Sequence, residues 1–240
     1  MKEELIRSAF VLGDEAIERL QKKKVILFGV GGVGSFCAEA LARIGIGTIT
    51  LVDPDDVSVS NINRQLIALH STVGRNKAEV MKERIADINP DAVVTALPMF
   101  YLPENADEID LSAYDMIIDA IDTVSAKVEL AVRANKLGIP MLCSMGTGNK
   151  LHPELLEISD ISKTSVCPLA RVMRRELKKR NITEVKVVYS EESVELGDVD
   201  RTQSENTKKI APPSMLFVPA VAGLYIAREV VMDLIKDKEN

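Results

Sequence analysis

The stretch VILFGVGGVG, residues 25–34, decides the fold of this 240-residue chain. Its first four residues are apolar and predict a short buried strand, after which Gly29, Gly31 and Gly34 have the spacing of a tight turn that opens a helix. The free amide groups at the start of that helix, near Gly32, would face an anion such as a phosphate. Asp53 ends the next apolar run, near the distance at which an acidic side chain holds a ribose hydroxyl. The pattern predicts a nucleotide site and leaves NAD, FAD and ATP open as ligands.

Strand-like and helix-like segments alternate along the chain, which predicts an α/β fold with a Rossmann-like, doubly wound and mainly parallel sheet. The predicted strands are 25–28, 48–52, 92–97, 116–119 and 140–143, and the predicted helices are 14–22, 32–44, 76–88 and 124–137. A C-terminal extension adds strands near 155–158 and 185–189 and helices at 168–180 and 219–235. We expect residues 1–240 to form a single domain, with a flexible loop over 191–213.

Composition narrows the class of protein. No signal-like segment precedes the first strand, and no apolar run reaches the roughly 20 residues that span a membrane. We therefore expect a cytoplasmic protein that does not contact a membrane. Cys37, Cys143 and Cys167 are widely spaced and form no Cys-x-x-Cys pair, so neither a disulfide framework nor a zinc site is expected. The formal net charge of -6 weighs against a general nucleic-acid binder.

A polar cluster follows the second predicted strand. Asn61, Arg64 and Gln65 would lie beside the phosphates, because ligands of open α/β sheets bind outside the carboxyl ends of the strands. Arginine offers a fork of donors that matches phosphate oxygens. Asn76 is a plausible cap for the next helix, and Lys77 in its first turn opposes the helix dipole unless an anion lies opposite. A polar loop without a ligand is the alternative explanation.

Two carboxylates end the fourth predicted strand. Asp119 and Asp122 beside a polyphosphate would suit Mg²⁺, either directly or through water. The alternative is that Asp122 caps a helix that starts at Thr123.

Three further features have ordinary explanations when taken alone. Arg7 resembles a surface arginine. Cys167, with neither histidine near it in the sequence, is better explained as a structural or exposed thiol than as a nucleophile. The basic run Arg171, Arg174, Arg175 and Lys178, continued by Lys179 and Arg180, could be a solvated helix face or a surface for an anion or RNA.

Taken in order, these motifs resemble the ubiquitin-activating-enzyme-like superfamily. The segments RSAFVLGDEAIERL, VDPDDVSVSNINRQ, DAIDT and KTSVCPLARVMRRELKKR resemble its tRNA threonylcarbamoyladenosine dehydratase branch. The resemblance implies an adenylating domain, with Arg7, Arg64, Lys77 and Asp122 as catalytic residues. It implies Mg²⁺ on Asp122 and a homodimer in which Arg7 reaches the partner's site. The implied ATP-binding residues are Gly29, Gly31, Gly32, Gly34, Asp53, Asp55, Asn61, Arg64, Gln65, Lys77 and Asp122.

The implied reaction is ATP-dependent adenylation of the threonylcarbamoyl carboxylate beside the tRNA anticodon. Ring closure follows, with release of AMP and pyrophosphate, and the basic run of residues 171–180 becomes a candidate tRNA contact. A competing hypothesis is adenylation of the C-terminal glycine of a ubiquitin-like sulfur-carrier protein, although that branch normally carries two zinc-binding Cys-x-x-Cys pairs. An NAD-dependent oxidoreductase and a non-catalytic binding protein that retains the fold are two more hypotheses. A sulfur-transfer or sulfur-carrier-like protein is a possible partner.

Overall fold

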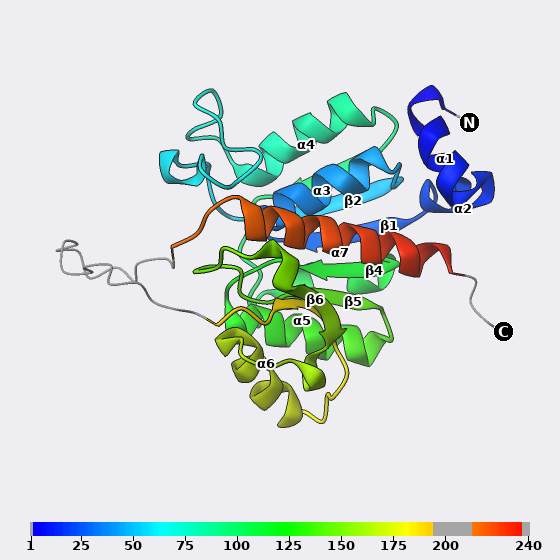
Figure 1. The fold of residues 1–240 in the computed structure, drawn as a ribbon. Helices are drawn as coiled ribbons and strands as arrows, with labels where there is room; N and C mark the ends of the chain where they lie inside the picture. Colours follow the sequence, from blue (N-terminus) through cyan, green and yellow to red (C-terminus); the bar gives the residue numbers. More distant parts are fainter. Residues whose placement is uncertain (1, 194–212, 237–240) are drawn as a thin grey trace.

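The computed structural model describes residues 2–193 and 213–236, so the predicted loop over 191–213 lies largely outside the described residues. Its centre is a seven-stranded sheet in the order β3-β2-β1-β4-β5-β7-β6 (Figure 1). The strands are β1 Lys24–Phe28, β2 Thr48–Val52, β3 Val93–Leu97, β4 Met116–Asp119, β5 Met141–Ser144, β6 Leu156–Asp160 and β7 Lys186–Ser190. Neighbouring strands are parallel except for β6, which pairs antiparallel to β7. The predicted α/β class and mainly parallel sheet are confirmed.

The predicted helices are all present, with ends that differ by up to two residues, and one further helix was not predicted. They are α1 Ile6–Leu12, α2 Asp14–Leu20, α3 Gly34–Arg43, α4 Lys77–Ile88, α5 Val124–Leu137, α6 Pro168–Lys178 and α7 Phe217–Ile235. The sequence did not predict α1, which is seven residues long and is separated from α2 only by Gly13 at φ +88°. The helix expected from residue 32 begins at Gly34, because the residues before it form the turn.

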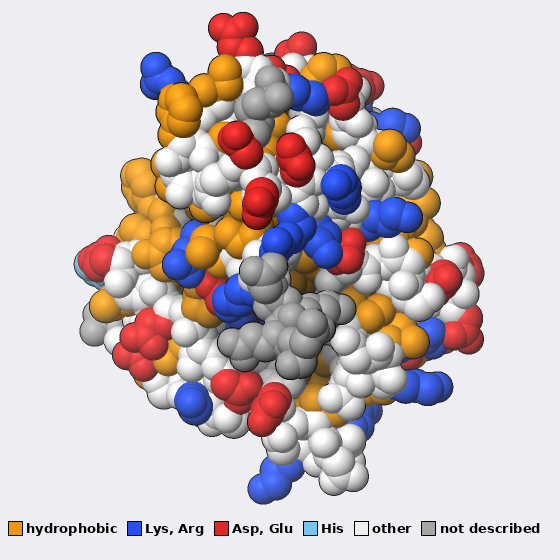
Figure 2. Space-filling model, turned by 90° about the vertical axis from the view of Figure 1, so that its right-hand side faces the viewer, with side chains coloured by type: hydrophobic (Ala, Val, Ile, Leu, Met, Phe, Trp, Pro, Cys, Tyr) orange, Lys and Arg blue, Asp and Glu red, His pale blue; other side chains and the backbone are white. Residues whose placement is uncertain are grey.

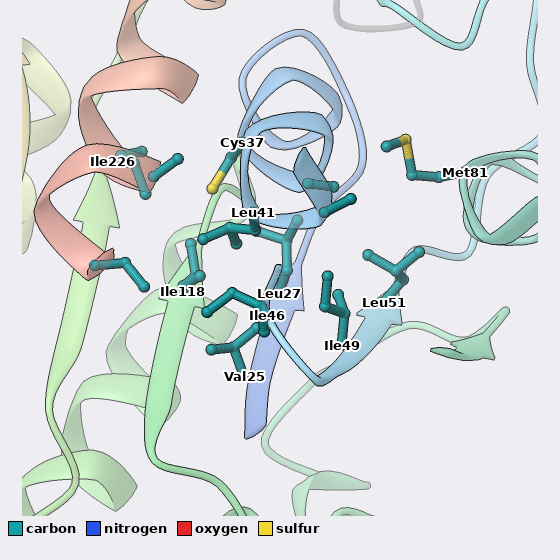
Figure 3. Close-up of a cluster of buried hydrophobic side chains, with 14 of the residues drawn as sticks. Val25, Leu27, Cys37, Leu41, Ile46, Ile49, Leu51, Met81, Ile118 and Ile226 are labelled. Atoms are coloured by element: carbon teal, nitrogen blue, oxygen red, sulfur yellow. The ribbon is translucent and has the colours of Figure 1, made fainter. Parts of the chain in front are cut away.

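Helices cover both faces of the sheet, and this explains why β1 is a continuous apolar run. Val25 and Leu27 point to the face covered by α3, α4 and α7, where they pack in the cluster of Figure 3. Ile26 and Phe28 point to the opposite face, which α5 covers. The C-terminal extension adds a further cluster of buried residues between α5, α6 and the strands β5 and β7.

Two glycines allow α3 to start directly against the end of β1. Gly29 has φ +87°, and a Cβ on it would lie 2.6 Å from the carbonyl oxygen of Ala120. A Cβ on Gly34 would lie 1.8 Å from the carbonyl oxygen of Gly29. Neither position accepts a side chain, so the turn between β1 and α3 keeps its tight course.

The strand order places the point of topological reversal between β1 and β4. From β1 the chain builds outward through β2 and β3, and then returns to the other side of β1 with β4. Ligands of such sheets bind at this point, outside the carboxyl ends of the strands. The opposite side of the molecule, shown in Figure 2, carries interspersed acidic and basic side chains. Among the described helices, none has the length and apolar character needed to cross a membrane.

Candidate functional site

A cavity of about 810 Å³ opens at the carboxyl ends of β1, β2 and β4, where the topology predicts a ligand. Its volume lies in the range of sites for small molecules and cofactors. The residues singled out from the sequence that line it are Gly29, Gly31, Gly32, Asp53, Asp55, Asn61, Arg64, Gln65, Lys77 and Asp122. Gly34 is not among the lining residues and instead packs against the backbone of Gly29. The fold therefore brings most of the predicted nucleotide site together.

Asp53 connects the glycine turn to the second strand. Its Oδ2 accepts a hydrogen bond of 2.6 Å from the amide of Val30, and its Oδ1 accepts one of 2.9 Å from the amide of Asp55. Burial raises the pKa of this carboxyl group, while the charge of Lys77 acts in the opposite direction. A carboxylate has about four acceptor positions, so Asp53 can still accept a ribose hydroxyl.

The polar cluster forms one wall of the cavity. The Oδ1 of Asn61 caps a short 3-10 helix, Val59–Asn61, by accepting from the amide of Ser58 at 3.1 Å. Nη1 of Arg64 donates to the carbonyl of Ser60 at 2.9 Å, which fixes the guanidinium on its own loop. The Oε1 of Gln65 is buried and has no hydrogen-bond partner among the described residues. Such an oxygen costs about 1–3 kcal/mol, and a donor on a ligand would satisfy it.

Lys77 lies at the start of α4. The predicted cap is confirmed, because Oδ1 of Asn76 accepts from the amides of Ala78 and Glu79 at 3.0 and 3.3 Å. The anion opposite Lys77 is Asp55, whose Oδ2 lies 2.8 Å from Nζ. The Lys77 side chain is only 8% exposed, whereas that of Asp55 is 59% exposed. The ion pair therefore holds a largely buried cation at the cavity wall.

The two carboxylates at the carboxyl end of β4 have different surroundings, which corrects the expectation that they act together. Asp119 is fully buried, and its Oδ2 lies 2.8 Å from Nζ of Lys127, so it is not available to a metal ion in the cavity. Asp122 is exposed and lines the cavity. The capping alternative for Asp122 is also wrong, because α5 has Thr123 at its cap position and no side-chain capping bond.

Arg7 lies far from the cavity of its own chain. It is exposed on α1, which precedes β1 and lies at the amino end of the sheet, opposite the cavity (Figure 1). A five-residue strand spans roughly 17 Å. The length of the strands therefore separates Arg7 from the cavity of its own chain, and Arg7 is not among the lining residues.

The cysteines are all buried. Burial raises the pKa of Cys37 and of Cys143, which keeps both as thiols. Cys167, directly before α6, is 1% exposed and packs in the C-terminal cluster, as expected of a structural thiol.

The basic run lies on α6, which buries Ala170, Met173 and Leu177 on its inner face. Arg171, Arg175 and Lys178 are exposed. Arg174 is not part of that surface, because its Nη1 donates to the carbonyl of Thr164 at 2.8 Å. Leu169, in the first turn of α6, lines the cavity, so α6 begins at the cavity rim, although none of its basic side chains is a lining residue.

An apolar wall was missed from the sequence. Residues 99–102, which follow β3 after Pro98, line the cavity together with Phe28. The rings of Phe28 and Tyr101 lie 4.7 Å apart at 59°. Burial raises the pKa of Tyr101 to about 12. The signal was a run of large apolar residues at the end of a strand, and such a wall suits a planar base.

Comparison with known proteins identifies the family. The sequence profile of the ThiF family matches residues 3–240. The chain belongs to the ThiF family. It is 47% identical over 247 residues to the tRNA threonylcarbamoyladenosine dehydratase of Bacillus subtilis strain 168, covering 100% of this chain and 97% of the relative. The resemblance predicted from the sequence is confirmed.

Solved structures agree with this assignment. The E. coli tRNA N6-threonylcarbamoyladenosine dehydratase in complex with AMP is 34% identical to this ThiF-family chain. It superposes with a TM-score of 0.88, over 97% of this chain and 94% of the other. The complex of the same enzyme with ATP gives a TM-score of 0.85 at 33% identity.

Replacing Lys77 by Met tests whether its cation serves a nucleotide in the cavity. We expect ATP to bind about 10- to 100-fold more weakly, the equivalent of one charged hydrogen bond of about 1.5–3 kcal/mol. The Asp55→Asn variant breaks the same ion pair but leaves the ammonium, and we expect it to bind ATP nearly as the wild type does. Titration calorimetry measures both. Equal losses in the two variants would show that Lys77 matters only through the ion pair.

Proposed function

We propose that this ThiF-family protein uses ATP to adenylate the threonylcarbamoyl carboxylate of N6-threonylcarbamoyladenosine in tRNA, and then closes that side chain to a ring. One observation carries the proposal. A single cavity joins the glycine turn, the unpartnered oxygen of Gln65 and the cations of Arg64 and Lys77, in a chain that matches a named dehydratase over its full length.

The residues that line the cavity suggest how ATP would lie in it. The E. coli relative has been solved with AMP and with ATP. The base would lie on the apolar wall of Phe28 and residues 99–102, with the ribose at Asp53. The phosphates would then meet the glycine turn, from which Gly29, Gly31 and Gly32 line the cavity. The remaining polar contacts would come from Asn61, Arg64, Gln65 and Lys77.

The chemistry needs positive charge around the α-phosphate. A carboxylate oxygen of the substrate attacks that phosphorus, the bond to the bridging oxygen breaks, and pyrophosphate leaves. Arg64 and Lys77 stabilise the charge that develops in this step. An atom of the ureido group then attacks the activated carbonyl carbon, the bond to the phosphate oxygen breaks, AMP leaves, and the ureido group loses a proton to solvent.

The second step is intramolecular, so orientation can replace an enzyme nucleophile. The buried cysteines agree with this, because none of the three is exposed at the cavity.

A magnesium ion fits the residues at the rim. The Asp122 carboxylate is exposed and lines the cavity, and Mg²⁺ is commonly held by one or two carboxylates together with substrate phosphates. Asp122 would hold it, and the ion would neutralise the negative charge of the pyrophosphate leaving group.

The substrate is tested by ATP–pyrophosphate exchange. We expect exchange with tRNA that carries N6-threonylcarbamoyladenosine, and at least about a 100-fold lower rate with an unmodified transcript or a ubiquitin-like sulfur-carrier protein. Mass spectrometry of the digested tRNA should show the cyclic nucleoside. The Arg64→Ala variant should lose exchange, because removing a preorganised donor to the transition state costs about 10²–10³-fold. Exchange that depends on the carrier protein and ignores tRNA would instead support a sulfur-carrier adenylyltransferase.

A homodimer with Arg7 acting in the partner's site is part of the proposal. Arg7, Phe10 and Val11 have the spacing of one helix face on α1. Phe10 and Val11 are 84% and 81% exposed, so α1 presents large apolar side chains beside an arginine. Covering this face with a second copy would bury them.

Mixing two inactive variants tests the action of Arg7 in trans. We expect Arg7→Ala and Lys77→Ala each to be inactive alone, and their mixture to recover about a quarter of wild-type activity. Each mixed dimer then has one site with both side chains intact, and half of the dimers are mixed. A mixture as inactive as its components would show that Arg7 acts within its own chain or not at all.

The exposed face of α6 is proposed to contact the tRNA backbone, because α6 begins at the cavity rim with Leu169 and carries Arg171, Arg175 and Lys178 exposed to solvent. We expect Arg171→Glu to raise the KM for tRNA about five- to tenfold, to lower the salt dependence of binding, and to leave the KM for ATP unchanged. Lys82→Glu on α4 makes the same change of net charge on another helix and is the control. If both variants raised the KM for tRNA equally, the effect would come from net charge alone.

A further inference from the structure

A buried lysine joins two strand ends below the cavity. Lys127 of α5 is 0% exposed, as is Asp119, and its Nζ lies 2.8 Å from Oδ2 of that aspartate. Nζ also donates to the carbonyl of Ser144 at 2.8 Å and to the carbonyl of Ile121 at 3.1 Å. A lysine ammonium has three donors, and all three have a partner here.

The two carbonyls belong to the two segments that form the floor of the cavity. Ile121 precedes Asp122 at the carboxyl end of β4, and residues 120–123 line the cavity. Ser144 ends β5, and residues 144–148 also line the cavity. Lys127 itself is not among the lining residues. Lys127 therefore contacts both segments from the interior of the protein and does not reach a ligand in the cavity.

We propose that Lys127 is a positioning residue of the nucleotide cavity, which holds the segment of Asp122 and the segment 144–148 at a fixed separation through one shared ammonium. The inference depends on the proposed function only for the choice of ATP as the ligand.

Stability alone does not explain this arrangement. A buried ion pair adds little net stability, because desolvation of the two charges offsets their attraction, and apolar residues of similar size often serve as well. Asp119 has two hydrogen bonds that do not involve Lys127. Its Oδ1 accepts from the amide of Ile121 at 3.0 Å, and its Oδ2 accepts from the thiol of Cys143 at 3.1 Å. The contribution unique to Lys127 is the link between the carbonyls of Ile121 and Ser144.

Two variants that break the same ion pair separate positioning from stability. Lys127→Met removes both bonds to the carbonyls. Asp119→Asn leaves them, because even a neutral lysine amine keeps two N–H groups. At a temperature where thermal unfolding shows both to be folded, we expect Lys127→Met to bind ATP about tenfold or more weakly. We expect Asp119→Asn to stay within about threefold of the wild type, since displacement of site residues by about 1 Å is enough to impair a site.

A double variant keeps the test decisive if Lys127→Met fails to fold. Asp119→Leu with Lys127→Met removes both buried charges, so we expect its unfolding temperature to return toward that of the wild type. Its affinity for ATP should remain at least about tenfold weaker. Cys143→Ala changes the same buried cluster without touching either carbonyl, and should bind ATP as the wild type does.

Three results would overturn the proposal: a double variant that regains wild-type ATP binding along with its stability, an Asp119→Asn variant as weak as Lys127→Met, or a wild type that binds no ATP. A wild type that binds ATP but does not cyclise the modified tRNA would refute the proposed function alone. The comparison of ATP affinities would then still decide the role of Lys127.

Discussion

The structure depends on one close contact, that between the backbone of Gly29 and Gly34. Because a Cβ at Gly34 would lie 1.8 Å from the Gly29 carbonyl oxygen, only glycine lets α3 begin directly at the end of β1. The amides of the turn are thereby left at the cavity, and one of them, that of Val30, binds Asp53 at the end of β2. This contact also lets α3 pack closely on β1, and α7 packs beside α3 in the same core. The cavity and the core on this face therefore have a common origin.

Charge at the site is arranged in pairs. Lys77 is held by Asp55 at the cavity wall, and Lys127 is held by Asp119 below the floor. The two pairs differ in exposure, and the difference separates their roles. Asp55 is 59% exposed and can release its partner to a phosphate, whereas Lys127 and Asp119 are both fully buried and can only hold the backbone around them. In the proposed mechanism, residues of similar chemistry would thus serve nucleotide binding in one pair and the geometry of the backbone in the other.

Adenylation chemistry does not by itself choose an acceptor. In the proposed reaction the cavity would hold the nucleotide with Arg64 and Lys77 at its α-phosphate, and this arrangement would suit any carboxylate that can reach it. Features outside the cavity would make the choice, namely the exposed basic side chains of α6 and, in the proposed dimer, the arginine of α1. The C-terminal extension holds α6 in place, because it adds a cluster of buried residues between α5 and α6.

The sequence by itself determined what depends on local pattern. It was sufficient for the strand and glycine turn at 25–34, the mainly parallel sheet, the cap at Asn76, and the gathering of Asn61, Arg64 and Gln65 at one edge, because topology places successive strand ends together. Only the tertiary structure decided which side chains face the cavity. Asp119 and Asp122 are three residues apart, yet one is buried against Lys127 and the other is exposed. Arg174 turns inward beside an exposed Arg175, and residues 99–102 become a wall only once β3 is placed. The reason is physical: local sequence specifies backbone and periodicity, whereas burial and partners are set by elements distant in the chain.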